Sequence, residues 1–459
     1  MSSLIMAYWM KVSFSCKNPS PWAISPGESE RLWIGRMKKT SETATVAAGE
    51  RADWWLLGLC SSRVFSQVIV MTYAAAIPVL QQEWGMSAVK AGAISSGFQL
   101  GYAFSLFVMS ILADRVGPKV LYLWSMFAGG LLSVAFAVFA REYFSALLLY
   151  CLLAIALGGT YTTGLMILAE RYPPEKRGRA SGYFIASSST GFVLSLALSG
   201  WTLPLGGYRL SFAAASVCSI LGWLFSWGFL RKVRLAPVVH HEARTLKTEV
   251  LSNKPVLMLM AAYTLHCWEL LGMWAWTPAF LTAYLASRGF DGLSAAGIGS
   301  YVTAAFHCAG LFASFLMGGL SDRLGRAFVI MVSAAVSTLC SLTFGWSMGL
   351  PFAVVSAIGL AYAFSALSDS PVLSAALTEV TPSSFLGRAF GLRSLLGFGA
   401  GAVSPVVFGA VLDWVNPVGS AELQNAAWGW AFTSLGLPGL ATFWIAVRLN
   451  RVLIEGSMK

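Results

Sequence analysis

Long apolar runs alternate with short polar links over most of this chain. Twelve runs of helical length follow one another, and none shows the strict alternation of a half-buried strand. About 20 apolar residues span a bilayer as a helix, and lipid admits only helices or closed barrels. The pattern therefore predicts an all-α polytopic membrane protein with twelve transmembrane helices. The predicted spans are residues 54–80, 91–112, 119–140, 144–169, 180–203, 209–231, 255–285, 295–320, 327–347, 350–378, 386–412 and 428–449.

The link between the sixth and seventh spans is longer than the others. It carries His240, His241 and several basic side chains, and it separates six spans from six. We therefore predict two pseudo-symmetric six-helix halves joined by a cytoplasmic linker. The predicted segments are a cytoplasmic N-terminal segment at 1–53, a first half at 54–231, the linker at 232–254, a second half at 255–449 and a cytoplasmic tail at 450–459.

The first 53 residues are polar and mixed, without a sustained hydrophobic period. Such a segment buries too little apolar surface to fold alone, so we expect it to be disordered. Within it, Met37-Lys38-Lys39-Thr40 resembles a natural start. We therefore expect residues 1–36 to be dispensable for membrane insertion.

The chain contains an internal repeat. Residues 110–119 read Ser-Ile-Leu-Ala-Asp-Arg-Val-Gly-Pro-Lys and residues 318–326 read Gly-Gly-Leu-Ser-Asp-Arg-Leu-Gly-Arg, with the aspartates 208 positions apart (114 to 322). A second pair, at 178–182 and 387–391, has the pattern Gly-Arg-Ala-x-Gly and an offset of 209 (178 to 387). Two motifs that recur in one order at nearly one offset indicate two copies of one structural unit.

These motifs fall where one apolar run ends and the next begins. Their glycines permit a tight reversal, and each aspartate can accept hydrogen bonds from helix amides or from an arginine. We expect Arg179 and Arg388 to be those arginines. A plain polar turn is the alternative for one copy, but four copies at matched spacing argue against it. The residues predicted to tie helix ends together, or to gate, are Asp114, Arg115, Arg179, Asp322, Arg323, Arg326 and Arg388.

Charge is scarce and unevenly placed. Hydrophobic residues make up 57% and charged residues 11% of the 459, against about 25% charge in soluble domains. The net charge of +11 would suit a nucleic-acid partner, but the basic residues sort by membrane side. With the N-terminus inside, 25 of the 31 Lys and Arg fall in inside segments, and 4 fall outside. This asymmetry predicts a plasma-membrane protein with both termini in the cytoplasm and no nucleic-acid partner.

Catalytic and cofactor chemistry find no support in the sequence. The seven cysteines lie mostly alone in apolar runs, without CxxC or metal-ligand spacing. There is no P-loop for direct ATP drive and no hydrolase or redox constellation. We therefore predict that the protein is not an enzyme and that it holds no cofactor and no metal.

Two repeated six-span halves, with Gly-x-Leu-Ser-Asp-Arg-x-Gly-Arg between the second and third spans of a half, resemble the major facilitator superfamily and its anion and organic-acid porters. The resemblance covers about residues 54–449, and the first motif copy departs from it at Ser110 and Pro118. It implies alternating access, in which two halves rock about a central site. It also implies that the first, fourth, seventh and tenth spans line the cavity. The second, fifth, eighth and eleventh would form the seam between halves.

Four charged residues fall within predicted spans: Arg63, Glu269, Asp369 and Arg393. A charge at mid-bilayer costs about 2.5–3.5 kcal/mol on insertion scales, so each requires a partner, water or a function. We predict that Arg63 anchors an anionic or polar substrate and that Glu269 or Asp369 carries a coupling proton. Arg393 is expected to pair with Asp369. Static ion pairs that fix helix register are the alternative interpretation.

Further polar and aromatic side chains within the spans are candidates for the same site. The predicted substrate contacts are Arg63, Tyr161, His266, Trp274 and Trp276. The two tryptophans would equally suit an interfacial belt, and the histidine would equally suit a single hydrogen bond to a neighbour. Gln99 and His307 correspond at the offset of 208, so we predict seam contacts that change during rocking. One interhelical hydrogen bond each is the alternative.

The leading interpretation is a proton-coupled secondary transporter, a symporter of a small organic or inorganic anion. Its expected partners are that substrate, protons and membrane lipid, and we expect a monomer. One alternative is a proton-antiport exporter of drugs or hydrophobic cations, in which Glu269 or Asp369 would contact the substrate. The Gly-Pro-Gly pattern typical of drug antiporters is not evident in the fifth span. A second alternative is a non-transporting membrane receptor on the same scaffold, which would tolerate loss of the cavity charges.

Overall fold

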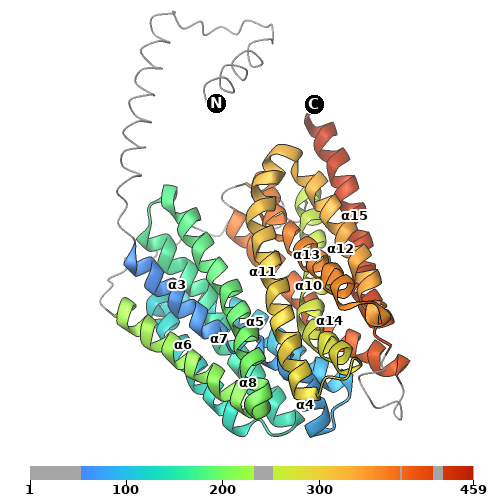
Figure 1. The fold of residues 1–459 in the computed structure, drawn as a ribbon. Coiled ribbons are helices and arrows are strands. Elements are labelled where there is room, and N and C mark those ends of the chain that lie inside the picture. Colours follow the sequence, from blue (N-terminus) through green and yellow to red (C-terminus); the bar gives the residue numbers. More distant parts are fainter. Residues whose placement is uncertain (1–52, 232–251, 383–384, 417–426, 458–459) are drawn as a thin grey trace, which may run out of the picture. The chain divides into compact units, whose positions relative to one another are not determined.

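The computed structural model describes residues 53–231, 252–382, 385–416 and 427–457, which are almost entirely helical (Figure 1). From Trp55 onward the chain forms one compact unit. The predictions for residues 1–52 and for linker residues 232–251 lie outside the described part. The helices are α3 (Trp54–Gln67), α4 (Thr72–Trp84), α5 (Ala88–Val116), α6 (Pro118–Phe139), α7 (Tyr143–Arg171), α8 (Pro174–Leu230), α10 (Lys254–Ala286), α11 (Gly292–Leu324), α12 (Arg326–Phe344), the short 3-10 helix η1 (Ser347–Gly349), α13 (Phe352–Val380), α14 (Leu386–Val415) and α15 (Gly429–Ser457).

Within the described residues, 11 helical stretches are long and apolar enough to cross a bilayer. One of them, α8, contains two glycines in non-helical conformations, Gly206 with a φ of −157° and Gly207 with a φ of 62°. This kink falls where the sequence predicts the link between the fifth and sixth spans. The predicted all-helical, multi-pass fold is confirmed, and the divided α8 accounts for the twelfth span.

The first span is interrupted. Helix α3 ends at Gln67 and α4 begins at Thr72, so residues 68–71 separate them. Two other helices bond the interrupted backbone: Met71 N donates to Ser195 Oγ at 3.1 Å, and Tyr150 OH donates to Val70 O at 2.6 Å. Backbone polar groups at membrane depth need such partners. The unbroken helix predicted at 54–80 is therefore wrong in this detail.

Glycines form the two motif turns, as the sequence predicts. Gly117 joins α5 to α6 with a φ of 92°, and Gly325 joins α11 to α12 with a φ of 89°. A side chain would be strained at these angles. We call the face of the helix bundle that carries these turns the motif face. Helices α5 and α11 end there and begin at the opposite face.

Side-chain caps start both helices at that opposite face. Ser87 accepts from Lys90 N at 3.3 Å at the start of α5. Asp291 accepts from Ser294 N at 3.1 Å at the start of α11. The hydrogen bonds from the Ser294 side chain and backbone lower the pKa of Asp291. Each cap satisfies an amide that has no partner inside its own helix.

The helices fall into two groups, α3 to α8 and α10 to α15, which meet along a seam (Figure 1). Across the seam α5 packs along α14 and α8 packs along α11, while α4 contacts α10 and α11. The glycine contacts between α8 and α11 fall in the part of α8 before its kink. These four helices are the second, fifth, eighth and eleventh spans, which the family resemblance implies as the seam.

Aromatic side chains fill the interior of each group. In the first group Tyr150 lies against Phe98 and Phe136, with ring centroids 4.5 and 5.2 Å apart. In the second, Phe280 and Phe344 are 4.6 Å apart. Because lipid is as apolar as these side chains, close packing of this kind holds membrane helices together.

Candidate functional site

A cavity of about 260 Å³ lies between the two groups of helices. Its aromatic lining residues are Tyr73, Phe98, Tyr102, Tyr150, Tyr161, Phe192, Tyr263, Trp274 and Phe398. Its polar lining residues are Arg63, Gln67, Ser95, Gln99, Ser188, Ser189, His266 and Ser370. Among the described residues no carboxylate lines this cavity, so Arg63 gives its wall a positive charge.

Arg63 lies in α3 and is only 1% exposed. Its Nε donates to Ser188 Oγ at 2.9 Å, and its Nη2 donates to Tyr102 OH at 3.3 Å. A further donor, Nη1, bonds Thr160 Oγ1. The guanidinium also lies 5.6 Å from the ring centroid of Tyr161. Neutral oxygens and a ring therefore hold this cation, and no described carboxylate pairs with it.

The interruption between α3 and α4 adjoins this arginine. Gln67, the last residue of α3, lines the cavity, and so do Val70 and Met71 within the interruption. The Gln67 amide nitrogen is buried and has no hydrogen-bond partner in the described structure. The cavity wall beside Arg63 thus offers an unused donor next to irregular backbone, as substrate sites in discontinuous membrane helices do.

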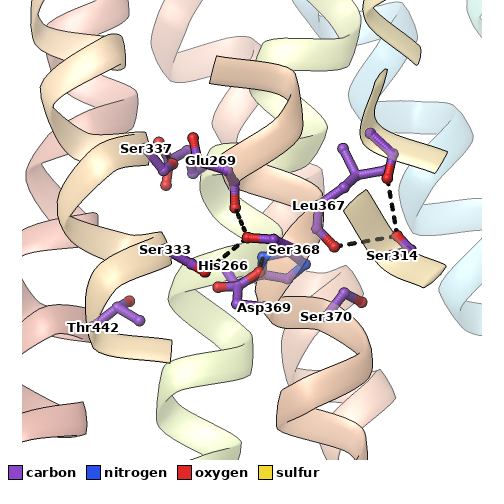
Figure 2. Close-up of polar contacts among 12 residues, drawn as sticks. His266, Glu269, Ser314, Ser333, Ser337, Leu367, Ser368, Asp369, Ser370 and Thr442 are labelled. Atoms are coloured by element: carbon purple, nitrogen blue, oxygen red, sulfur yellow. Dashed lines mark hydrogen bonds and ion pairs between the residues drawn. The ribbon is translucent and has the colours of Figure 1, made fainter. Parts of the chain in front are cut away.

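The second group of helices contributes a buried His–Asp pair. His266 of α10 lines the cavity, and its Nδ1 lies 2.8 Å from Oδ1 of Asp369 of α13. Both residues are 5% exposed. Figure 2 shows the two side chains directed toward each other. The neighbouring Ser370, rather than Asp369 itself, reaches the cavity wall.

The predicted pairing of Arg393 with Asp369 is wrong. The Arg393 Nη1 donates to Ser374 Oγ at 2.9 Å, and the guanidinium lies over the Tyr263 ring at 3.9 Å. Ser374 is five positions after Asp369 on the same helix, which is a rotation of about 140° at roughly 100° per residue. The face of α13 that meets Arg393 is therefore a different one from the face that carries the carboxylate.

Glu269 points away from the cavity, toward α12. It is 5% exposed, and its Oε1 accepts from Ser337 Oγ at 2.5 Å. Buried hydroxyls surround this contact: Tyr362 OH donates to Ser341 Oγ at 3.0 Å, and Thr338 Oγ1 has no partner among the described groups. Figure 2 shows Glu269 of α10 beside Ser337 of α12.

Sequence reasoning missed these hydroxyls, although the repeat contains a signal for them. At the offset of 208, Ser333 and Ser341 correspond to Ser125 and Ser133 in the first half. Two of the positions between them, Ser337 and Thr338, correspond to Gly129 and Gly130. The second half therefore adds two hydroxyls where the first half has none, and a carboxylate meets one of them.

The aromatic candidates separate into lining and core residues. Tyr161 and Trp274 line the cavity. Trp276 does not: it is 0% exposed, its Nε1 donates to Pro405 O at 3.0 Å, and its ring stacks on Phe408 at 5.0 Å. This burial also excludes an interfacial belt for Trp276, so its prediction as a substrate contact is corrected to a packing role.

Gln99 and His307, matched by the repeat, have different surroundings. Gln99 lines the cavity. His307 packs behind the cavity wall, with its ring 5.2 Å from Trp274 and 6.4 Å from Phe192. Its Nε2 is buried without a hydrogen-bond partner in the described structure, beside a second space of about 10 Å³, the size of one water molecule.

The second motif copy ties three helix ends together at the motif face. Arg326 Nη2 lies 2.5 Å from Asp322 Oδ1 and 2.9 Å from Glu379 Oε1. Arg326 is therefore the partner that the structure gives to Asp322, where Arg388 was expected. Arg388 lies over the Phe385 ring at 5.9 Å.

The first motif copy is only partly covered by the described residues. The side chain of Asp114 lies outside the described residues. Arg179 Nε donates to Tyr183 OH at 3.3 Å. Arg115 and Arg323 are exposed at the ends of α5 and α11. The first copy thus gives no described counterpart of the Arg326 network.

Comparison with known families identifies the class of protein that this fold represents. Residues 59–306, slightly more than half of the chain, match the model of the Major Facilitator Superfamily. The chain belongs to this family of membrane transporters, as the two-fold repeat and the motif turns predicted.

Several characterised transporters are similar to this chain over most of their length. The gallate transporter of Pseudomonas putida is 27% identical over 85% of this chain and 90% of its own. The hexuronate transporter of Bacillus subtilis is 23% identical over 76% of this chain and 85% of its own. The 4-hydroxybenzoate transporter PcaK of Pseudomonas aeruginosa is 24% identical over 88% and 92%.

Two solved structures share the fold. A bacterial homologue of the human lysosomal transporter Spinster, in an inward-facing and unoccupied conformation, has a TM-score of 0.69 and 15% identity over 87% of this chain and 97% of its own. The nucleoside transporter NupG has a TM-score of 0.65 and 14% identity over 86% and 99%.

Proposed function

We propose that this protein is a secondary active transporter that moves a small organic anion together with protons by alternating access. The observation that carries the proposal is Arg63. It is a buried cation in a cavity between two halves, and its described hydrogen-bond partners are neutral oxygens. A charge inside a membrane protein is costly without a counter-charge. A bound anion would supply that counter-charge.

The surroundings of Arg63 suit a small carboxylic acid that carries an apolar ring or chain. A guanidinium binds carboxylates through two parallel hydrogen bonds. Tyr102 and Phe398 lie 5.8 Å apart in the same wall and would cover an apolar ring or chain. The names of the similar transporters, for gallate, hexuronate and 4-hydroxybenzoate, support an organic acid as the substrate.

We assign the coupling proton to Glu269. Its carboxylate lies behind the cavity wall with Ser337, so a proton and an anion would not compete for the same atoms. In the interior a carboxylate is stabilised either by protonation or by a cation, and alternating access would expose it to each side in turn. His266 of the His266–Asp369 pair lines the cavity, so the pair would link Glu269 to the anion site.

We further propose that the motif face is cytoplasmic and that the protein acts as a monomer in the plasma membrane. The distribution of Lys and Arg along the sequence supports this orientation, because basic residues favour cytoplasmic loops.

The exporter alternative requires a carboxylate in contact with a cationic substrate. The described cavity wall has none, and both candidate carboxylates lie behind it. The receptor alternative requires that the cavity charge be dispensable. Both alternatives make predictions opposite to ours for Arg63.

Transport by proteoliposomes tests the proposal. Uptake of labelled aromatic and aliphatic carboxylates is measured for the unmodified protein, Arg63→Gln and Arg393→Gln. Loss of one partner of a buried charge pair costs about 2 kcal/mol or more, so we expect Arg63→Gln to raise the apparent KM at least about 30-fold.

Arg393→Gln is the matched control, because this second buried arginine does not itself line the cavity: it donates to Ser374 and lies over the ring of the lining residue Tyr263. We expect its KM to change by less than about fivefold, or roughly 1 kcal/mol. A folded Arg63→Gln protein with unchanged anion uptake would contradict the proposal. Uptake of cationic dyes in place of anions would favour the exporter.

A further inference from the structure

A carboxylate from one half caps a helix of the other half. Asp413, in the last turn of α14, accepts from Ala88 N through Oδ1 and from Val89 N through Oδ2, both at 2.8 Å. Ala88 and Val89 are the first two residues of α5. Asp413 is 325 positions from Ala88 and 324 positions from Val89 in the sequence. It thus joins two helices that lie on opposite sides of the seam.

This contact completes the start of α5. The first four amides of a helix have no partner within it. Ala91 N already makes the first bond of the helix ladder, to Ser87 O, and of the three amides before it, which belong to Ala88, Val89 and Lys90, the Ser87 side chain takes that of Lys90. The remaining two amides are the ones that Asp413 accepts. The positive end of the α5 dipole lies at the same place, so a carboxylate there gains further stabilisation.

The backbones of the two helices are in close contact on the same stretch. A Cβ at Gly409, one turn before Asp413, would lie 2.3 Å from Ala88 O. A Cβ at Gly92 would lie 2.2 Å from Pro405 O. The glycines therefore allow an approach that side chains would prevent, and that approach brings the carboxylate within reach of the amides.

The other pair of seam helices, α8 and α11, makes a similar close glycine contact but lacks a carboxylate at the position that corresponds to Asp413. A Cβ at Gly200 of α8 would lie 3.0 Å from Gly297 O of α11. At the repeat offset of 209, Gly200 corresponds to Gly409, and Pro204 corresponds to Asp413. The repeat thus places a proline ring at one seam and a hydrogen-bonding carboxylate at the other. The charged contact is specific to the α5–α14 pair.

These contacts lie on the side of the seam away from the motif face. Helix α5 begins and α14 ends at the opposite face. Near the motif face, a Cβ at Gly182 of α8 or Gly318 of α11 would meet no atom within 4 Å. The tight glycine contacts between the seam helices described here therefore lie toward the opposite face.

We propose that Asp413 is a clasp that locks the two halves together at the face opposite the motif turns. It stabilises the conformation in which the cavity is shut on that side, and it must release α5 each time the cavity opens there. The proposal rests on alternating access as the proposed function. The clasp itself can be measured without substrate.

Asp291 provides a matched control. It is also an aspartate that caps a helix at the opposite face, through Ser294 N at 3.1 Å. Its helix, α11, follows it directly in the same half. Asp413→Asn and Asp291→Asn therefore remove the same charge from the same kind of contact, but only the first substitution weakens a contact across the seam.

The test measures the distance between the halves at the opposite face. Spin labels on unnatural amino acids at the exposed positions Arg141 and Phe290 leave the native cysteines in place. Pulsed electron resonance on the full chain in nanodiscs, without substrate, gives the populations of short and long distances. We expect Asp413→Asn to increase the ratio of long to short distances about tenfold, the effect of weakening one charge-assisted hydrogen bond. Asp291→Asn should leave the ratio unchanged.

A second variant removes a donor from the other side of the contact. Ala88→Pro deletes one amide at the first position of α5, where proline is tolerated. Ser87 before it already has an extended conformation, with a ψ of 164°, which suits a residue preceding proline. We expect the same shift as for Asp413→Asn. The clasp is refuted if either seam variant keeps the native distance distribution, or if Asp291→Asn shifts it equally.

Discussion

Trp274 and Trp276 are two positions apart on α10 and have different surroundings. Two residues rotate a helix by about 200°, so neighbouring side chains of this kind face nearly opposite directions. Trp274 lines the cavity, and Trp276 is fully buried against Phe408 and Trp428. The helical period alone argues that both could not line one cavity. The sequence did not indicate which of the two faces inward.

The two tryptophans make a prediction at the residue scale. Trp276→Ala should lower the free energy of unfolding by about 3–5 kcal/mol, because it leaves a large cavity in a packed core. Trp274→Ala should lower it by less and should raise the KM for the anion. Denaturant unfolding in detergent and proteoliposome uptake measure the two effects. A larger stability loss for Trp274→Ala would contradict the assignment.

At the scale of elements, the interruption of the first span shows where periodicity fails. Residues 68–71 read Val-Ile-Val-Met, an apolar run without glycine or proline. Nothing local ends a helix there. The bonds that hold the interruption come from Ser195 of α8 and Tyr150 of α7, which are distant in sequence. Contacts of this kind are not readable from a single stretch of chain.

We predict that losing one of the hydrogen bonds to this interruption destabilises the protein. Ser195→Ala leaves the Met71 amide buried without its acceptor, which should destabilise the protein by about 1–3 kcal/mol. Ser219→Ala is the control: this equally buried hydroxyl of α8 bonds only Ala215 O of its own helix, at 3.2 Å. Denaturant unfolding should separate the two variants. Equal losses would show that the interruption does not depend on Ser195.

For the whole molecule, the repeat and the apolar runs predicted most of the architecture. They predicted the helices and the tight turns at Gly117 and Gly325, while the helices that form the seam followed from the family resemblance. The cavity brings together Arg63, Tyr161 and His266. The sequence singled them out because a polar side chain inside a membrane is costly unless it has a partner or a function.

The pairing of side chains across helices could not be predicted in the same way. Asp369 pairs with His266 rather than with Arg393, and Glu269 faces Ser337 rather than the cavity. Each outcome depends on how far a helix is rotated about its own axis, which packing determines. Spacing along one helix fixes which residues share a face, but not what that face meets.

The central claim is that an anion and a proton move together through sites that are separate. The most direct test is to follow external pH when a transported carboxylate is added to proteoliposomes without an imposed gradient. Our account predicts alkalinisation outside the vesicles that depends on the anion. In Glu269→Gln that alkalinisation should be lost, while exchange of labelled for unlabelled anion continues. Anion uptake by the unmodified protein without any proton movement would contradict the account.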